Sequence, residues 1–244
     1  RPSTNPLIIH VASEQIAQRY VTTCPLAASR LAQAFWPGPL TIVLPKNPII
    51  PHNATATLHP VALRIPNHPL ALELLRAFDG ALAAPRANSS THVSPTTAQH
   101  VRDEFPSPQP AMILDGGPCS VGIESTVLDL TTPQPTVLRP GQITPADLLP
   151  IIGPVQSLQT ITPTSTPSTS PGQHETHYAP RTPAFRFNTS QRPLLPSHPI
   201  GLLLLSPEPN LGQWEHIVAM PNDPAQYAQQ PYALLRDRKS TRLN

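Results

Sequence analysis

The chain has 244 residues, of which 12% are charged and 36 are proline, and its formal net charge is +2. A chain of this length forms one large domain, or one domain with a smaller one beside it. The excess of proline predicts many fixed turns and at least one extended linker, and the low net charge gives no indication of a surface that coats nucleic acid. No apolar run approaches the roughly 18 residues that a membrane-spanning helix needs, so no membrane association is expected.

The first part of the chain alternates between helical and strand patterns. Apolar residues at helical spacing predict helices, and short apolar runs between turn residues predict strands. In chain order, we expect helices at 11–20 and 25–35, strands at 40–45 and 61–66, a helix at 68–78 capped by Asn67, strands at 80–85 and 111–115 with a helix at 96–105 between them, strands at 125–130 and 136–139, and a helix at 144–152 starting at Thr144. Strands mixed with helices of about ten residues indicate an α/β domain.

The sequence changes in character near residue 154. From 154 to 176 it is dominated by Ser, Thr and Pro and has no periodicity, which is typical of a linker or an extended arm. Beyond it, the run "IGLLLLS" predicts a buried strand, and 224–238 predicts a helix. We therefore expect a small second α/β unit that starts near Pro183.

Polar side chains gather at the ends of the predicted strands and in the loops beside them. They are Arg1, Asn5, His10, Arg64, the loop 86–96 with Ser94, Ser125, Thr126 and Arg139. Taken singly, each has an ordinary explanation: His10 as a core histidine, Arg64 as part of an exposed strand face, Ser94 as a helix cap. Together, arginines and hydroxyls at strand ends suit an anionic ligand, phosphate or carboxylate, bound over an open sheet.

No pair of nucleophile and base accompanies these residues. Cys24 and Cys119 have no adjacent His and no metal-ligand spacing, and no base for Ser125 is defined by the sequence. The pattern therefore indicates catalysis by positioning and charge neutralisation, or no catalysis.

Several of these segments resemble a known enzyme family. The runs "RPSTNPLIIH", "FWPGPLTIVLP", "VALRIPNHPLALELL", "LAAPRANSSTHVSPT", "GIESTVLDL" and "VLRPGQI" are similar to the YrdC-like threonylcarbamoyl-AMP synthases, and "SPGQHETHYAP" resembles the linker of their long, two-domain form. The resemblance implies a YrdC-like twisted open mixed sheet with flanking helices at 1–153, a linker or lid at 154–182, and a small Rossmann-like C-terminal domain at 183–244. It also implies that the family's first strand and helices precede Arg1 and are absent from this chain, and that the C-terminal domain is partial.

The resemblance also implies a reaction. Enzymes of this family condense L-threonine, bicarbonate and ATP to threonylcarbamoyl-AMP and pyrophosphate. A tRNA-modifying threonylcarbamoyl transferase then uses the product for threonylcarbamoyladenosine. By resemblance we expect a cytoplasmic nucleotidyltransferase, with Mg²⁺ carried mainly by the ATP phosphates and with tRNA as a further candidate partner.

The resemblance assigns roles to named residues. ATP would be bound by Arg1, Asn5, Arg86, Ser94, Arg139 and, from the linker, Tyr178; threonine would be bound by His10, Arg64, Ser125 and the backbone of Ala84. No catalytic group beyond these positioning residues is expected. Arg86 departs from the family pattern, which has Ser at this place; the arginine either adds a phosphate ligand or blocks the nucleotide.

Three other interpretations stay open from the sequence. One is the YrdC-like carbamoyl-transfer module of hydrogenase maturation proteins, which the linker argues against. Another is a YrdC-like RNA-binding module, which a near-neutral chain with few aromatic residues does not favour. The third is an inactive fragment.

Overall fold

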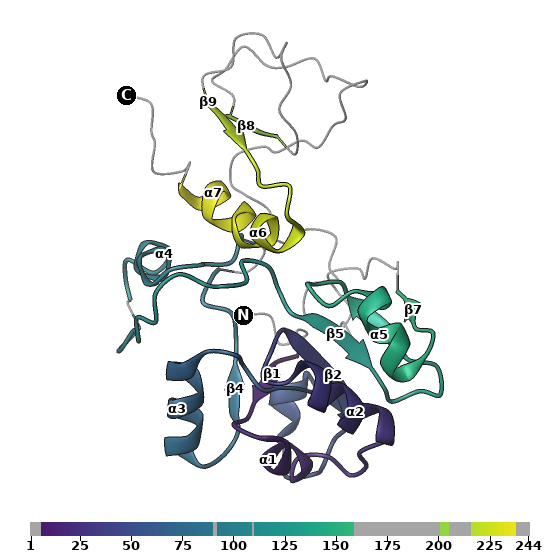
Figure 1. Ribbon diagram of the computed structural model, residues 1–244. Helices are drawn as coiled ribbons and strands as arrows, with labels where there is room; N and C mark the ends of the chain where they lie inside the picture. Colours follow the sequence, from purple (N-terminus) through teal and green to yellow (C-terminus); the bar gives the residue numbers. More distant parts are fainter. Residues whose placement is uncertain (1–5, 90–91, 109, 159–200, 205–215, 238–244) are drawn as a thin grey trace.

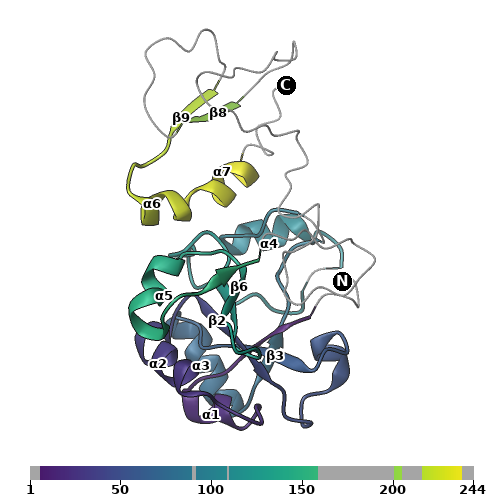
Figure 2. The same ribbon diagram turned by 90° about the vertical axis from the view of Figure 1, so that its right-hand side faces the viewer.

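The computed structural model describes residues 6–89, 92–108, 110–158, 201–204 and 216–237. Within these residues, a seven-stranded sheet with helices forms the larger part (Figure 1). A two-stranded parallel sheet of β8 (Gly201–Leu204) and β9 (His216–Ala219), followed by α6 (Pro224–Gln229) and α7 (Pro231–Asp237), forms the smaller part. In both views α6 and α7 lie between the small sheet and the large part (Figures 1 and 2). The α/β class and the mixed sheet expected from the sequence are confirmed.

The large sheet is mixed, with strand order β4-β1-β3-β2-β5-β6-β7. Pairing is parallel between β1 and β3, β2 and β5, and β6 and β7, and antiparallel elsewhere. The strands are β1 (Ile8–His10), β2 (Leu40–Pro45), β3 (Pro60–Arg64), β4 (Leu82–Ala84), β5 (Thr126–Asp129), β6 (Thr136–Arg139) and β7 (Gln156–Ser157).

The hydrophobic core lies between one face of this sheet and its helices. Alternate residues of β2 divide between the two faces, because successive side chains of a strand point to opposite sides: Ile42 and Leu44 join the main core, and Val43 joins a smaller cluster on the other face. Four helices contribute buried residues to the main core, namely α1 (Glu14–Gln18), α2 (Leu26–Phe35), α3 (Pro69–Phe78) and α5 (Pro145–Ile152).

The strand directions bring several predicted site residues to one edge of the sheet. β1, β3 and β6 run in one direction, and β2 and β5 run in the other. The last residues of β1, β3 and β6 (His10, Arg64 and Arg139) therefore lie at the same edge as the first residue of β5, which follows Ser125. The geometry of the sheet alone places these four polar residues at the same end of its strands β1 to β6.

Helix starts follow local side-chain chemistry. Thr144 caps α5 in a reciprocal capping box with Asp147, as its predicted position at the start of that helix implied. Thr97, and not Ser94, caps α4 (Ala98–Glu104), by accepting a hydrogen bond from the backbone of His100. His68, and not the predicted Asn67, occupies the N-cap position of α3, without a side-chain hydrogen bond.

Other sequence predictions differ from the structure. The run 111–115 forms no strand. Helix α1 begins only at Glu14, because Val11 continues the sheet by donating its backbone N–H to Arg64 and because Ser13 is the cap. The helix expected at 224–238 is two helices that meet before Pro231, a residue that lacks the N–H a continuous helix needs. β7 lies inside the predicted linker and pairs with β6.

A short 3₁₀ helix, η1 (His52–Thr55), precedes β3. Among the described residues, no helix has the length and the hydropathy that crossing a lipid bilayer requires.

Candidate functional site

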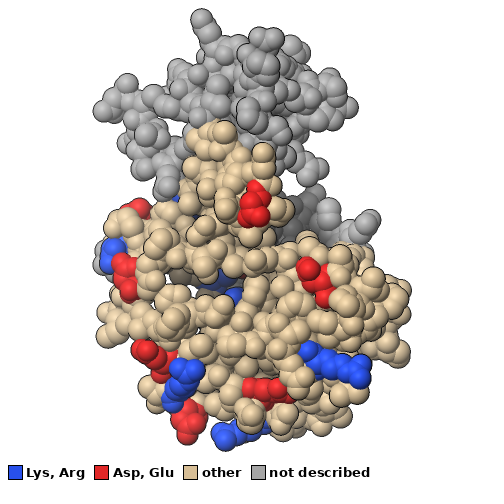
Figure 3. Space-filling model, in the orientation of Figure 1, with Lys and Arg blue, Asp and Glu red and all other residues tan. Residues whose placement is uncertain are grey.

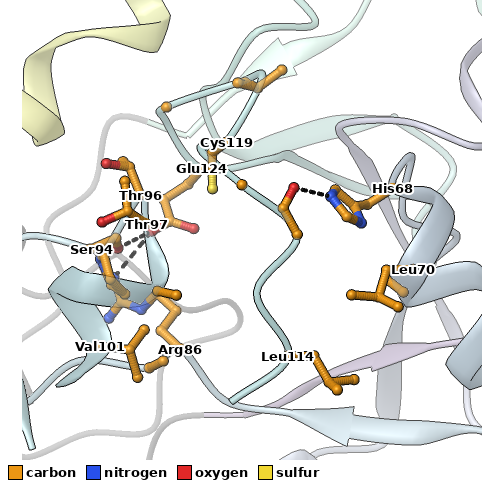
Figure 4. A pocket seen from close by; sticks show the side chains of 18 of the residues that line it. His68, Leu70, Arg86, Ser94, Thr96, Thr97, Val101, Leu114, Cys119 and Glu124 are labelled. Atoms are coloured by element: carbon orange, nitrogen blue, oxygen red, sulfur yellow. Dashed lines mark hydrogen bonds and ion pairs between the residues drawn. The ribbon is translucent and has the colours of Figure 1, made fainter.

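A cavity of about 560 Å³ opens beside the edge of the sheet described above. It is lined by the end of β3 and the start of α3, by parts of 86–101, and by 113–125, which leads into β5. In Figure 4, His68 and Leu70 of α3 lie on one side and Arg86, Ser94 and Glu124 lie on the other. Figure 3 shows the molecule in the orientation of Figure 1. Basic side chains lie inside a hollow on the face in view, and charges of both signs are scattered over the rest of that face.

Arg64, the last residue of β3, brings a cation into the cavity wall. Its Nε donates a hydrogen bond to the carbonyl of Gly38 at 2.9 Å, and none of the described residues bonds its terminal nitrogens. Burial lowers the pKa of Arg64, and the nearby charge of Arg139 adds to this, while Glu124 acts in the opposite sense. Arginine stays charged in any protein, so a guanidinium with two unused terminal NH2 groups is suited to a planar carboxylate.

Ser125 is held in place by two neighbours. Its hydroxyl lies 2.8 Å from the hydroxyl of Thr41 on β2 and accepts a bond of 3.0 Å from Nη2 of Arg139. Arg139 also donates from Nε and Nη2 to the carbonyl of Ser125. Arg139 is 4% exposed and is not among the residues that line the cavity. The structure therefore places Arg139 behind Ser125, where it fixes the start of β5; its predicted ATP contact stays a prediction.

Ser94, Arg86 and Glu124 form a polar cluster in the cavity wall that lies opposite His68 and Leu70 (Figure 4). The hydroxyl of Ser94 donates a hydrogen bond of 2.5 Å to Oε1 of Glu124, and Nη1 of Arg86 lies 3.6 Å from the same oxygen (Figure 4). Glu124 is the only acidic side chain among the residues that line this cavity in the described part of the chain. Glu124 is not among the site residues that the sequence predicts. Its position directly before Ser125 was the only signal that could have identified it.

His10 lies beside Arg64 but does not line the cavity. The two residues are paired across β1 and β3. Its Nδ1 is buried and has no hydrogen-bond partner among the described residues. Burial, and then the charge of Arg64, lower the pKa of His10 to about 4, so the ring is neutral at physiological pH.

The other predicted contacts fall outside the cavity or outside the described residues. Ala84 is exposed at the end of β4, is paired with Ile8, and does not line the cavity. Arg1, Asn5 and Tyr178 lie outside the described residues. The structure thus brings Arg64, Ser125, Ser94 and Arg86 together around one cavity, with His10 and Arg139 adjoining it. Their contacts with ligands remain predictions.

Within the described ranges, no group of three or more His, Cys, Asp and Glu side chains is arranged to hold a metal ion. Cys119 lines the cavity, and its pKa is raised, first by burial and then by Glu124. Its thiol is therefore protonated at neutral pH and is a weak nucleophile.

Two family models together match nearly the whole chain. The model described as "Telomere recombination" matches residues 1–141, and the model described as "Threonylcarbamoyl-AMP synthase, C-terminal domain" matches residues 143–242.

Named relatives agree with these matches. The chain is 42% identical over 184 residues to a threonylcarbamoyl-AMP synthase of Bacillus subtilis, covering 75% of this chain and 53% of the relative. It is 41% identical over 181 residues to a threonylcarbamoyl-AMP synthase of Pyrococcus abyssi, covering 74% of this chain and 53% of that relative. The chain thus spans about half the length of these curated relatives.

The fold also matches a solved structure. A crystal structure of P. abyssi Sua5 complexed with L-threonine superposes with a TM-score of 0.82 at 30% sequence identity, covering 99% of this chain and 73% of that one. Taken with the two family models, this shows that the chain belongs to the YrdC-like threonylcarbamoyl-AMP synthase family, in its two-domain form.

Proposed function

We propose that this chain carries the active site of a threonylcarbamoyl-AMP synthase, a nucleotidyltransferase that condenses L-threonine, bicarbonate and ATP to threonylcarbamoyl-AMP and pyrophosphate. The observation that carries the proposal is one cavity lined by Arg64, Ser125, Ser94 and Arg86, in a chain of this family. Arg64 and Ser125 offer partners for an amino acid, and Ser94 and Arg86 offer donors for phosphate.

Threonine would occupy the wall at the sheet edge. The terminal nitrogens of Arg64 would pair with its carboxylate, because the planar guanidinium matches a carboxylate in a bidentate way. The fixed hydroxyl of Ser125 would bond the amino acid beside it. His10, which is paired with Arg64 across β1 and β3, has a buried Nδ1 without a hydrogen-bond partner among the described residues. The P. abyssi relative was crystallised as a complex with L-threonine, which supports threonine as the amino acid.

ATP would occupy the wall formed by Ser94 and Arg86. In the reaction, a carbamate oxygen of N-carboxy-threonine attacks the α-phosphorus, the bond from that phosphorus to the bridging oxygen breaks, and pyrophosphate leaves with the electron pair. Such a substitution needs aligned reactants and neutralised charge, and needs no protein nucleophile. This agrees with a cavity whose nearest thiol, Cys119, is kept protonated.

Magnesium would reach this site with the nucleotide. Glu124 is the only acidic side chain among the described residues that line the cavity, so the residues present fit a cation carried mainly by the ATP phosphates. Magnesium would supply charge neutralisation on the phosphates. We also propose that a tRNA-modifying threonylcarbamoyl transferase takes the product in the cytoplasm, because a carbamoyl adenylate is labile in water and suits direct transfer.

Calorimetric titration with amino acids tests the threonine half of the proposal. We expect L-threonine to bind, D-threonine not to bind, and L-valine, which has the same shape without the hydroxyl, to bind at least about tenfold more weakly. Equal affinity for L-threonine and L-valine, or no binding of L-threonine at millimolar concentration with ATP and bicarbonate present, would contradict the assignment.

A further inference from the structure

The helices α6 and α7 contact both loops that form the polar wall of the cavity. On one side, Nε2 of Gln229 in α6 donates a hydrogen bond to the carbonyl of Cys119 at 3.3 Å. Gly122, in the same loop, lies so close to α6 that a Cβ at this position would clash with the carbonyl oxygens of Ala228 and Gln229. The loop that leads to Glu124 and Ser125 is therefore packed against the C-terminal part of the chain.

On the other side, Arg236 of α7 is inserted beside the loop that carries Ser94. Its Nε donates to the carbonyls of Val93 at 3.0 Å and Ser94 at 3.1 Å, and its Nη2 also donates to Val93. Nη1 lies 3.4 Å from the carbonyl of His100. Arg236 is 8% exposed, and these bonds join residues up to 143 positions apart in the sequence.

Arg236 also forms an ion pair with Glu104, the last residue of α4. Nη2 lies 3.1 Å from Oε2, and the Glu104 side chain is 3% exposed. The other oxygen of Glu104 accepts the backbone N–H of Ser89 at 2.8 Å and lies 2.9 Å from Nδ1 of His92. Burial acts to raise the pKa of Glu104, but the bonds from Ser89 and His92 and the charge of Arg236 outweigh it and lower the pKa to about 2.

The contacts of Arg236 satisfy hydrogen-bonding groups of the loop that carries Ser94. Val93 and Ser94 lie in a loop without a regular element, so their carbonyls need partners from elsewhere when they are buried. A guanidinium supplies several donors in fixed directions, and its burial is tolerable only because the carbonyls and Glu104 satisfy it. The loop that carries Val93 and Ser94 and the end of α4 are thus held by one arginine, which lies in the part of the chain that matches the C-terminal domain model.

We propose that Arg236 is a positioning residue for nucleotide binding: through it, α7 sets the position of Ser94 and thereby the affinity of the cavity for ATP. The C-terminal domain then acts on the active site directly, because it holds the loop that carries Ser94. This inference rests on the proposed function, in which Ser94 lies on the ATP side of the cavity.

The test compares Arg236→Met, Arg236→Lys and the control Arg102→Met, which removes an exposed arginine from α4. Calorimetry gives the dissociation constants of a non-hydrolysable ATP analogue and of L-threonine, and hydrogen exchange follows the amides of 89–104. For Arg236→Met we expect about tenfold weaker binding of the ATP analogue, threonine affinity within about twofold of wild type, and faster exchange confined to this loop. Arg236→Lys, which keeps the charge, restores part of the affinity, and Arg102→Met changes nothing.

Two results would overturn the inference. One is an unchanged affinity of Arg236→Met for the ATP analogue. The other is an equal loss of affinity for the analogue and for L-threonine, with faster exchange throughout the seven-stranded sheet and its helices. The second result would mean that Arg236 only stabilises the fold. A wild-type protein that binds threonine but no ATP analogue would instead refute the proposed function, and the two failures are therefore distinguishable.

Discussion

Arg86 and Glu124 face each other with Nη1 and Oε1 3.6 Å apart, and the same oxygen of Glu124 accepts a hydrogen bond from the hydroxyl of Ser94. The carboxylate thus occupies the two groups that are predicted to bind phosphate. At the position where the resemblance implies Ser, Arg86 provides a positive charge beside the carboxylate of Glu124. The structure therefore favours Arg86 as a charge partner within the site over Arg86 as an obstacle to the nucleotide.

This relationship predicts the effect of Arg86→Ser. Removing the cation leaves the carboxylate of Glu124 uncompensated next to the ATP phosphates, and we expect ATP to bind about tenfold more weakly. The double variant Arg86→Ser with Glu124→Gln recovers part of this loss, because the repelling charge is also gone. Calorimetry with an ATP analogue measures both effects. Tighter ATP binding by Arg86→Ser would mean that the arginine blocks the site.

Arg64→Lys tests the amino acid side of the cavity. Lysine keeps the charge but cannot bond Gly38 and present two further coplanar donors. We expect the dissociation constant of L-threonine to rise about tenfold or more, with the ATP analogue unaffected. Arg30→Lys, at an exposed position of α2, is the matched control. Equal affinity of Arg64→Lys and Arg30→Lys for threonine would remove Arg64 from the binding site.

Ser125→Ala combines an effect on stability with one on binding. The change leaves Thr41 and one nitrogen of Arg139 without their hydroxyl partner inside the protein. We expect the free energy of unfolding to fall by about 1–2 kcal/mol and threonine binding to weaken. Urea denaturation measures the first effect, with Thr23→Ala in an exposed coil as control. An unchanged unfolding midpoint would show that the network around Ser125 contributes nothing to stability.

Glu104 predicts how stability depends on pH. Its pKa falls from 4.5 to about 2 on folding, so its contribution is fully present above about pH 4.5 and is lost as pH falls towards 2. At pH 7 this contribution is at most about 3 kcal/mol. In urea denaturation, we expect Glu104→Gln to be less stable than wild type at pH 7 and the difference to shrink at pH 3. A difference that stays constant from pH 7 to pH 3 would contradict this account.

Local features of the fold could be predicted from the sequence. The strands at 40–45 and 136–139 and the start of α5 at Thr144 follow from apolar runs and capping chemistry, which depend on neighbouring residues. The run 111–115 has the composition of a strand, but none of the strands in the described part of the chain pairs with it. β7 consists of two exposed residues in a segment rich in Ser, Thr and Pro, and carries no apolar pattern of its own.

The candidate site could be predicted only in part, for the same physical reason. The sequence alone indicates four of its polar residues. Arg64 and Ser125 lie at the ends of predicted strands, and Arg86 and Ser94 lie in a loop rich in hydroxyl and amide side chains. The role of Glu124 depends on the approach of two loops 30 residues apart, and that of Arg236 depends on a contact across 143 residues. Neither approach leaves a periodic signal in the sequence.

The most direct test of the proposed function is the release of pyrophosphate from ATP. Purified protein is incubated with ATP and Mg²⁺, and with L-threonine and bicarbonate together, singly or not at all. Because the carbamate forms only from both substrates, we expect release only when both are present. At limiting threonine, we expect release to be about tenfold slower or more in Arg64→Lys and unchanged in Arg30→Lys. Pyrophosphate release that does not depend on both threonine and bicarbonate, or no release with all substrates present, would contradict the proposed function.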